Sequence, residues 1–400
     1  MVNKLYIKPL VAFLICITAM SCTKRSSSTD NYIIPSKVYS IGLDSDDVIK
    51  FDTKAQCRII DNGNKLPGRT HFRGGYSSRF GKHSYAVKID KKHSIAGLPE
   101  DKDFILNASF IDKTFIRHKL SFDLFRMMNP DNKAPLCTYA ELYTNGKYNG
   151  LYVVMQKMDA STLGIDKTDN SSVIFKDPPI FYENRIVPQD SSNYYQQTYP
   201  KKKKEDRTYQ AEELHNFIFL ADDSTFNSKV ADIFDLSNIA DWHILLLLTN
   251  NGDGIRKNFF LYKCNDSIPY RIALWDYDHS FGRDGDGEYN MLSRNVDMNR
   301  NQLICRLMRT AEYRQMIIRR WEELRNKKII DIDNIVDIIN ANATIIRDAA
   351  IRDTTIWPIS SESDFFNDTD FDKEIRIMKD FVALNVQRLD SCFASINTTK

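Results

Sequence analysis

The sequence predicts a two-lobed α+β protein, with a β-rich lobe over residues 31–160 and a mainly helical lobe over residues 161–400. In the first part, short alternating apolar segments are separated by Gly, Asn, Asp and Pro, which is typical of strands and turns. In the second part, apolar residues recur at helical spacing. Of the 400 residues 42% are hydrophobic, so the chain can bury a core in each lobe.

The charge of the chain is nearly balanced. Its 55 Lys and Arg against 53 Asp and Glu give a formal net charge of +2, so no overall field favours binding to nucleic acid. The seven cysteines and seven histidines show neither a disulfide framework nor the spacing of zinc ligands. Partners must therefore be inferred from individual sites.

The first residues have the pattern of a signal peptide. Two lysines precede an apolar run at residues 10–17, which is too short to span a bilayer. A small residue then precedes Cys22, and this arrangement resembles the lipobox of bacterial lipoproteins. The resemblance implies that residues 1–21 are removed, that Cys22 carries a lipid anchor, and that residues 22–30 form a polar tether to the membrane of the bacterial cell envelope. An ordinary secretory signal and an uncleaved anchor are the alternatives.

The β-rich part is expected to form a twisted antiparallel sheet with one helix. Apolar residues between 115 and 127 recur at helical spacing, and Asp112 precedes them as a candidate cap. Asn-Gly pairs at 145–146 and 149–150 predict a hairpin. The predicted strands lie near 57–60, 84–90, 104–107, 140–143 and 151–156.

The second part begins with a change of character. Residues 161–210 are polar and include a run of four lysines, so we expect an exposed insertion there. Two short strands at 259–263 and 271–275 are expected to form a hairpin among the helices. The predicted helices lie at 212–221, 236–248, 302–325, 332–349 and 372–393.

This hairpin separates two acidic loops that hold the strongest candidates for chemistry. Asp253 lies on a glycine-flanked turn, Asn258 follows five residues later, and Asp276 follows the second strand. Phosphoryl transfer needs an aspartate to receive the proton of the substrate hydroxyl, and an asparagine and a second aspartate to hold magnesium. The spacing therefore predicts Asp253 as the catalytic base, and Asn258 and Asp276 as oxygen ligands of Mg²⁺ or Mn²⁺. Asp278 is expected to hold Asp276 in place, and capping of the segment that follows is the alternative.

Five sequence blocks occur in one order across most of residues 69–283: FRGGYSSR from Phe72, LNASFIDKTFIRHKL from Leu106, NGKYNGLY from Asn145, NGDG from Asn251 and WDYDHSFG from Trp275. In these blocks the chain resembles the CotH kinase family, atypical protein-kinase-like enzymes first associated with bacterial spore coats. The resemblance implies a protein-kinase-like fold that binds ATP with Mg²⁺ or Mn²⁺. It also implies that Asp253 is the catalytic aspartate and that Asn258 and Asp276 bind the metal. We expect transfer of the γ-phosphoryl group to Ser or Thr of an envelope protein or of the chain itself.

The loop that follows the first block is the candidate nucleotide site. Arg73, Ser77 and Ser78 are expected to contact the phosphates, and either Lys82 or Lys88 to supply a charge beside them. An exposed hairpin turn is the alternative interpretation of this loop.

Two more residues are candidates for a supporting role. The planar guanidinium of Arg117 could orient a phosphate or a catalytic carboxylate, and a solvated helix face is the alternative. Gln156 stands where many family members carry Glu, a difference that would alter a hinge or a nucleotide contact.

Two other functions compete with the kinase. A pseudokinase-like lipoprotein would bind an envelope partner without catalysis. A phosphohydrolase would use Asp276 as the nucleophile and Asp278 as acid or base, but the helical pattern after residue 276 argues against the alternating fold that such enzymes need.

Overall fold

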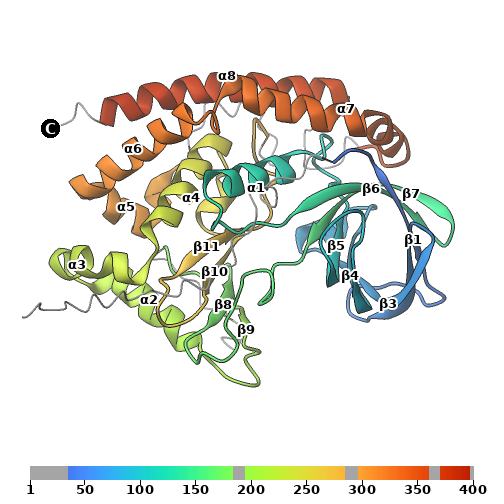
Figure 1. Ribbon diagram of the computed structural model, residues 1–400, viewed down its shortest axis with the longest axis horizontal. Helices are drawn as coiled ribbons and strands as arrows, with labels where there is room; N and C mark the ends of the chain where they lie inside the picture. The colour runs from blue at the N-terminus through green and yellow to red at the C-terminus, as the bar shows by residue number, and fades with distance from the viewer. Residues whose placement is uncertain (1–34, 183–193, 284–295, 360–369, 397–400) are drawn as a thin grey trace, which may run out of the picture.

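The computed structural model describes residues 35–182, 194–283, 296–359 and 370–396. A β-barrel and a helical body lie side by side, and two long C-terminal helices run across both (Figure 1). The predicted division into a β-rich first part and a helical second part is therefore confirmed. The predicted signal peptide, the tether and Cys22 lie outside the described residues.

Seven strands form the barrel, in the spatial order β1-β2-β3-β4-β5-β7-β6. Neighbours are antiparallel except β1 and β6, which close the barrel as a parallel pair with Tyr39 opposite Ala140. The expected twisted antiparallel sheet is present, but the expectation of a kinase-like lobe is wrong, because a pairing between the first and sixth strands closes the sheet into a barrel. The strands are β1 (Tyr39–Asp44), β2 (Ala55–Asp61), β3 (Asn64–Arg73), β4 (Ser84–His93), β5 (Asp101–Asn107), β6 (Cys137–Thr144) and β7 (Lys147–Gln156).

The hairpin β6–β7 is the wall that the barrel shares with the helical body. Successive side chains of a strand point to opposite faces. Ala140 and Tyr152 pack inside the barrel, whereas their neighbours Tyr139 and Val153 pack against the helices. Because both faces of this hairpin are buried, its register is strongly specified.

Helix α1 (Arg117–Met128) connects the barrel to the helical body and packs against α4 (Leu236–Thr249). The side chain of Asp235 caps α4 by accepting hydrogen bonds from the amides of Ser237 and Asn238. The helix ends at Asn250, which has left-handed backbone with a φ of 52°. This end directs the chain towards the predicted acidic loop.

A second sheet with the order β11-β10-β8-β9 lies beside α4. Its hairpin of β10 (Phe259–Lys263) and β11 (Arg271–Leu274) confirms the predicted hairpin. Strand β8 (Val173–Lys176) pairs with β10, and β9 (Gln197–Tyr199) pairs with β8. Val173, Ile174 and Phe175 are buried, so this part of the predicted exposed insertion belongs instead to the core.

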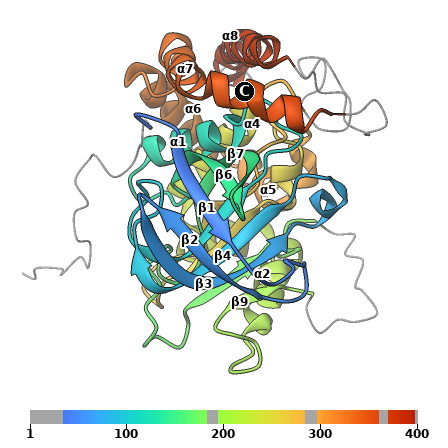
Figure 2. The same ribbon diagram turned by 90° about the vertical axis from the view of Figure 1, so that its right-hand side faces the viewer.

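Most of the other helices begin and end near the predicted positions, but the helix at Asp223–Ile233 was not predicted and the helix that begins at Ile332 continues to Ile356. The predicted helix at 302–325 is divided at Thr310, which caps the second piece. Figure 2, which views the barrel from its own side, shows α7 and α8 above the strands. In the described part of the chain, no helix is both long and apolar enough to cross a membrane. These helices are α2 (Thr208–Leu220), α3 (Asp223–Ile233), α5 (Gln302–Arg309), α6 (Ala311–Asn326), α7 (Ile332–Ile356) and α8 (Phe371–Ile396).

Candidate active site

A cleft of about 720 Å³ lies between the barrel and the loops at the base of the β10–β11 hairpin. One wall comes from the end of β3 and the loop after β5, and the other from the loops before β10 and after β11. The predicted candidates that line it are Arg73, Ser77, Lys82, Asp253, Asn258, Asp276 and Asp278. Ser78, Lys88, Arg117 and Gln156 do not line it.

Asp253 is positioned by the end of α4. Asn251 accepts a hydrogen bond from the amide of Gly254 at 2.9 Å, which holds a short 3-10 turn over Asp253–Ile255. The Asp253 carboxylate lies 3.0 Å from the ammonium of exposed Lys257. An exposed pair of this kind contributes little to stability. Asp253 therefore presents a solvent-accessible carboxylate to the cleft.

Asn258 and Asp276 flank the hairpin at its base. The amide of Trp275 donates to the carbonyl oxygen of Asn258 at 3.0 Å, so the two segments are directly joined. Both residues have left-handed backbone, with φ values of 67° for Asn258 and 57° for Asp276. A non-glycine residue in this conformation costs on the order of 1 kcal/mol, and such strain is concentrated at functional sites. The hairpin thus presents an amide and a carboxylate together.

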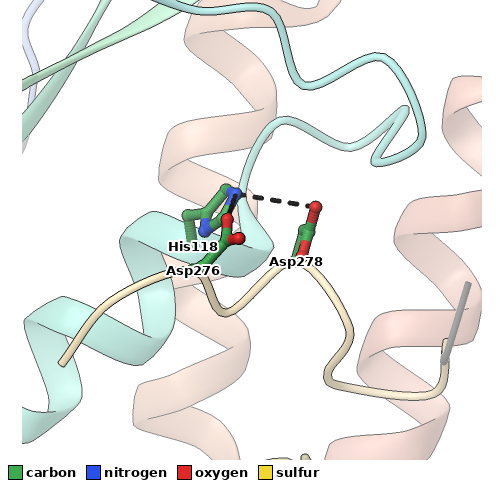
Figure 3. Close-up of side chains that lie close together, drawn as sticks. All are labelled: His118, Asp276 and Asp278. Atoms are coloured by element: carbon green, nitrogen blue, oxygen red, sulfur yellow. Dashed lines mark ion pairs between the residues drawn. The ribbon is translucent and has the colours of Figure 1, made fainter. Parts of the chain in front are cut away.

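His118 of α1 approaches the same loop from the other side (Figure 3). Its Nε2 atom lies 3.8 Å from Asp276 Oδ1 and 3.9 Å from Asp278 Oδ2. Ligand atoms of these three residues all lie within 4.8 Å of one another, a cluster that could hold a metal ion. Sequence analysis missed His118, because nothing in the spacing of α1 relates it to a loop so much later in the chain.

The electrostatics of Asp276 are those of a carboxylate in a crowded site. Desolvation in the cleft raises its pKa, and the neighbouring carboxylate of Asp278 raises it further, while His118 and Arg73 oppose the shift. Its side chain is still 49% exposed, so a ligand can reach it. A bound cation would stabilise the charged form of both carboxylates.

Arg73 supplies positive charge on the barrel side. Its guanidinium lies 5.1 Å from the centre of the Trp275 ring, a cation–π contact across the cleft. Burial lowers the pKa of Arg73 and Asp276 raises it, and an arginine remains protonated under such conditions. Lys176 and Lys257 also line the cleft, although sequence analysis did not select them.

Neither of the two predicted phosphate-binding lysines offers a free ammonium to the cleft. Lys82 is buried; it donates to the carbonyl oxygens of Ala108 at 2.8 Å and Leu151 at 2.5 Å and lies 2.6 Å from Asp353 Oδ1. These three partners match the three protons of its ammonium. Lys88 instead pairs at 3.1 Å with Asp103 on the barrel surface. Lys88 therefore lies on the barrel surface away from the cleft, whereas Lys82 lines the cleft with its ammonium held by structural partners.

The remaining candidates also have structural partners. Ser78 donates to the carbonyl of Gly75 at 2.7 Å, so it shapes the loop before the cleft. The side chain of Gln156 accepts from the amide of Leu136 at 3.2 Å. Neither residue is placed to contact a nucleotide in this cleft.

Arg117 supports the loop that carries the carboxylates. Its guanidinium is buried and binds Asp112 and Glu374, at 2.6 Å and 3.1 Å, and its Nε donates to the carbonyl of Ser280 at 3.0 Å. The alternative of a solvated helix face is wrong, because the side chain is enclosed between α1, α8 and this loop. Arg117 acts on the cleft through the backbone of Ser280 rather than by direct contact.

The chain is similar to known proteins over most of its length. Residues 70–389 match the family model described as CotH kinase protein. The chain is also similar to the inner spore coat protein H of Bacillus subtilis (strain 168), with 26% identity over 259 residues, which cover 63% of this chain and 69% of that protein. The match to the family model includes the cleft and extends into α8.

Proposed function

This chain belongs to the CotH kinase family, and we propose that it transfers the γ-phosphoryl group of ATP, with Mg²⁺ or Mn²⁺, to Ser or Thr hydroxyls of a protein substrate or of itself. The observation that carries the proposal is the placement of Asp253, Asn258 and Asp276 in one cleft, opposite Arg73. These are the groups that phosphoryl transfer requires.

The donor set fits a hard divalent cation. Asn258 and Asp276 would hold the metal through amide and carboxylate oxygens, the ligands that Mg²⁺ prefers. The raised pKa of Asp276 beside Asp278 supports this, because a cation relieves the repulsion between the two carboxylates. When bound, the metal neutralises charge on the phosphate oxygens.

The protein's own groups would then guide the transfer. Asp253 would accept the proton of the substrate hydroxyl while the hydroxyl oxygen bonds to the γ-phosphorus. The bond between the γ-phosphorus and the β,γ-bridging oxygen would break at the same time, and ADP would leave with that oxygen. Lys257, 3.0 Å from Asp253, and Arg73 across the cleft would contact phosphate oxygens. Phosphoryl transfer depends mainly on such positioning and charge stabilisation.

We further propose that the protein is attached to the bacterial cell envelope through a lipid on Cys22. The lipobox-like sequence supports this address. The relative's name places that protein in the inner spore coat, and by analogy this chain acts on a protein outside the cytoplasm. No nucleic acid is proposed as a partner.

The competing function is that of a pseudokinase-like protein that binds an envelope partner. One observation favours it: the lysine that the family resemblance offered as a phosphate contact, Lys82, is held by three other partners. Retention of Asp253, Asn258 and Asp276 in one cleft favours the enzyme.

The test is incubation of the protein from residue 23 onward with γ-labelled ATP and Mg²⁺ or Mn²⁺, followed by mass-spectrometric mapping. We expect label on Ser or Thr. Asp276→Ala should abolish transfer because a metal ligand is lost, whereas Asp266→Asn, on the exposed turn between β10 and β11, should leave it unchanged.

Three outcomes would contradict the proposal. Absence of nucleotide binding would favour the partner-binding lipoprotein. Label released to water through a phosphorylated Asp276 would favour the phosphohydrolase. Label on hydroxyl residues that persists in Asp276→Ala would show that other residues perform the chemistry.

Asp253→Asn separates binding from chemistry in the same assay. We expect nucleotide affinity close to that of the wild type, because the asparagine keeps the shape of the side chain. The rate of transfer should fall by about 10²-fold or more, as is typical when a positioned base is lost. A variant with an unchanged rate would remove Asp253 from the catalytic role.

A further inference from the structure

The buried imidazole of His118 faces the turn that carries Asp276 and Asp278 (Figure 3). The ring is only 1% exposed, and its Nε2 atom is nearly equidistant from the two carboxylates, at 3.8 Å and 3.9 Å. A histidine between two carboxylates can serve as a third metal ligand or as a hydrogen-bond donor that positions them. The other ring nitrogen distinguishes these two roles.

The Nδ1 atom of His118 accepts a hydrogen bond from the backbone amide of Tyr277 at 2.9 Å. A backbone amide can only donate, so Nδ1 carries no proton and the proton of the neutral ring is on Nε2. The side-chain nitrogen of Asn107 lies 3.4 Å from Nε2, but this contact is longer than the bond from Tyr277, which therefore determines the tautomer.

An Nε2 atom that carries a proton has no lone pair to offer a metal. It instead directs an N–H group towards both carboxylates. Distances of 3.8 Å and 3.9 Å exceed a hydrogen bond, and such contacts are often long before ligands bind and shorten in the working complex. The three-residue cluster is therefore better described as two carboxylates with a donor behind them.

The hydrogen bond from the Tyr277 amide to His118 also stabilises the backbone conformation of Asp276. Asp276 has a φ of 57°, a conformation that persists only where its surroundings enforce it. The amide of Tyr277 directly follows Asp276, and its bond to the rigidly packed ring of His118 holds this peptide in place.

We propose that His118 is a positioning residue for the metal site: its Nδ1 fixes the peptide that joins Asp276 to Tyr277, and its Nε2–H orients the carboxylates of Asp276 and Asp278, without ligating the metal. This inference rests on the proposed function, because it assigns Asp276 to a metal. It goes further in assigning α1, which packs against α4, the task of shaping the loop after β11.

The first test reads the tautomer directly and needs no activity. Protein labelled with ¹⁵N-histidine is measured by NMR with and without Mg²⁺ and ATP, and the His118 signals are identified by their loss in His118→Asn. We expect Nε2 to be protonated in every condition. A proton on Nδ1, or loss of the Nε2 proton when Mg²⁺ and ATP are added, would overturn the proposal.

The second test measures Mn²⁺ affinity by electron paramagnetic resonance in the presence of ATP. His118→Ala loses both contacts, and we expect its Mn²⁺ affinity to fall by 10- to 100-fold, the usual effect of removing a group that holds a metal ligand. His118→Asn can keep an acceptor near the position of Nδ1, so its affinity should lie between those of His118→Ala and the wild type. His243→Asn removes a buried histidine of α4 that lies outside the cleft, and it should bind Mn²⁺ like the wild type.

The outcomes separate this proposal from the proposed function. A folded His118→Ala variant with wild-type Mn²⁺ affinity would overturn the positioning role. Complete loss of Mn²⁺ binding in both His118 variants, together with an unprotonated Nε2, would show that His118 is a metal ligand. Wild-type protein that binds no Mn²⁺ would overturn the metal site itself, while the tautomer would still be measured.

Discussion

Lys82 of the barrel and Asp353 of α7 form a fully buried ion pair, with 2.6 Å between Nζ and Oδ1. The same oxygen of Asp353 accepts from the amide of Leu151 in β7 at 2.9 Å. One turn further on, the indole of Trp357 donates to the carbonyl of Asn149 at 2.9 Å. The C-terminal end of α7 is thus attached to the barrel by polar contacts that include a lysine at the edge of the cleft.

Removal of one partner from this pair should destabilise the fold. In Lys82→Met the carboxylate of Asp353 stays buried without its nearest cation, and loss of one member of a buried pair typically costs about 3–5 kcal/mol. Urea unfolding measures this cost. Lys88→Met, at the exposed pair with Asp103, should change the free energy of unfolding by less than about 1 kcal/mol.

The same variant distinguishes structure from nucleotide binding. If Lys82→Met had the same free energy of unfolding as the wild type but no longer bound ATP, Lys82 would be a phosphate contact. Asp353→Asn provides a matched check, because a purely structural pair predicts a loss of stability from either side.

Arg73 is expected to be the main barrel-side contact for the nucleotide phosphates. Arg73→Gln keeps much of the side-chain length but removes the charge, and loss of a charged hydrogen bond costs about 1.5–3 kcal/mol. We therefore expect the dissociation constant for ATP to rise by about 10- to 100-fold in a calorimetric titration. Arg69→Gln, on an exposed position of the same strand, is the control and should bind ATP normally. Equal affinities for both variants would remove Arg73 from the site.

The part of the site that could be predicted from sequence is the part built locally. Asn258 and Asp276 lie beside the two ends of one hairpin, so the pairing of β10 with β11 brings them together, and Asp253 lies only five residues before Asn258. The hairpin itself follows from two apolar segments and the turn between them. Most helix positions could also be predicted, because the spacing of apolar residues along a helix is a local pattern.

Contacts between distant segments could not be predicted in this way. The pairing of β1 with β6 closes the barrel, yet a strand pattern contains its period and its turns but not the identity of its partner. The ion pair of Lys82 could not be predicted for a related reason, since its partner Asp353 comes from α7. His118 escaped notice because its role arises only when α1 packs beside the loop after β11.

Attachment to the envelope can be tested independently of the fold. Cells that express the full chain are labelled with a lipid precursor, and we expect label on the wild type because Cys22 follows a lipobox-like sequence. Cys22→Ser should take no label, whereas Cys57→Ser, at a buried barrel position, should be labelled normally. An unlabelled wild type, or a labelled Cys22→Ser protein, would remove the proposed anchor.

The buried His243 of α4 should make the fold sensitive to acid. Burial lowers the pKa of His243 to about 3, below the value of about 6.5 expected in the unfolded chain. Between these pKa values only the unfolded chain binds a proton at His243, so the free energy of unfolding falls as pH falls. Above a pH of about 6.5 the titration of His243 no longer changes stability.

The free energy of unfolding of the wild type should therefore fall by about 2 kcal/mol more than that of His243→Phe when pH falls from about 7 to about 5. Phenylalanine can keep the stacking on Tyr313 but loses the 3.4 Å contact between His243 Nδ1 and the Tyr313 hydroxyl. Phenylalanine does not titrate, so the difference between the two pH dependences isolates the titration of His243. Urea unfolding of both proteins at the two pH values provides the measurement, and identical pH dependence would show that His243 is not buried in its neutral form.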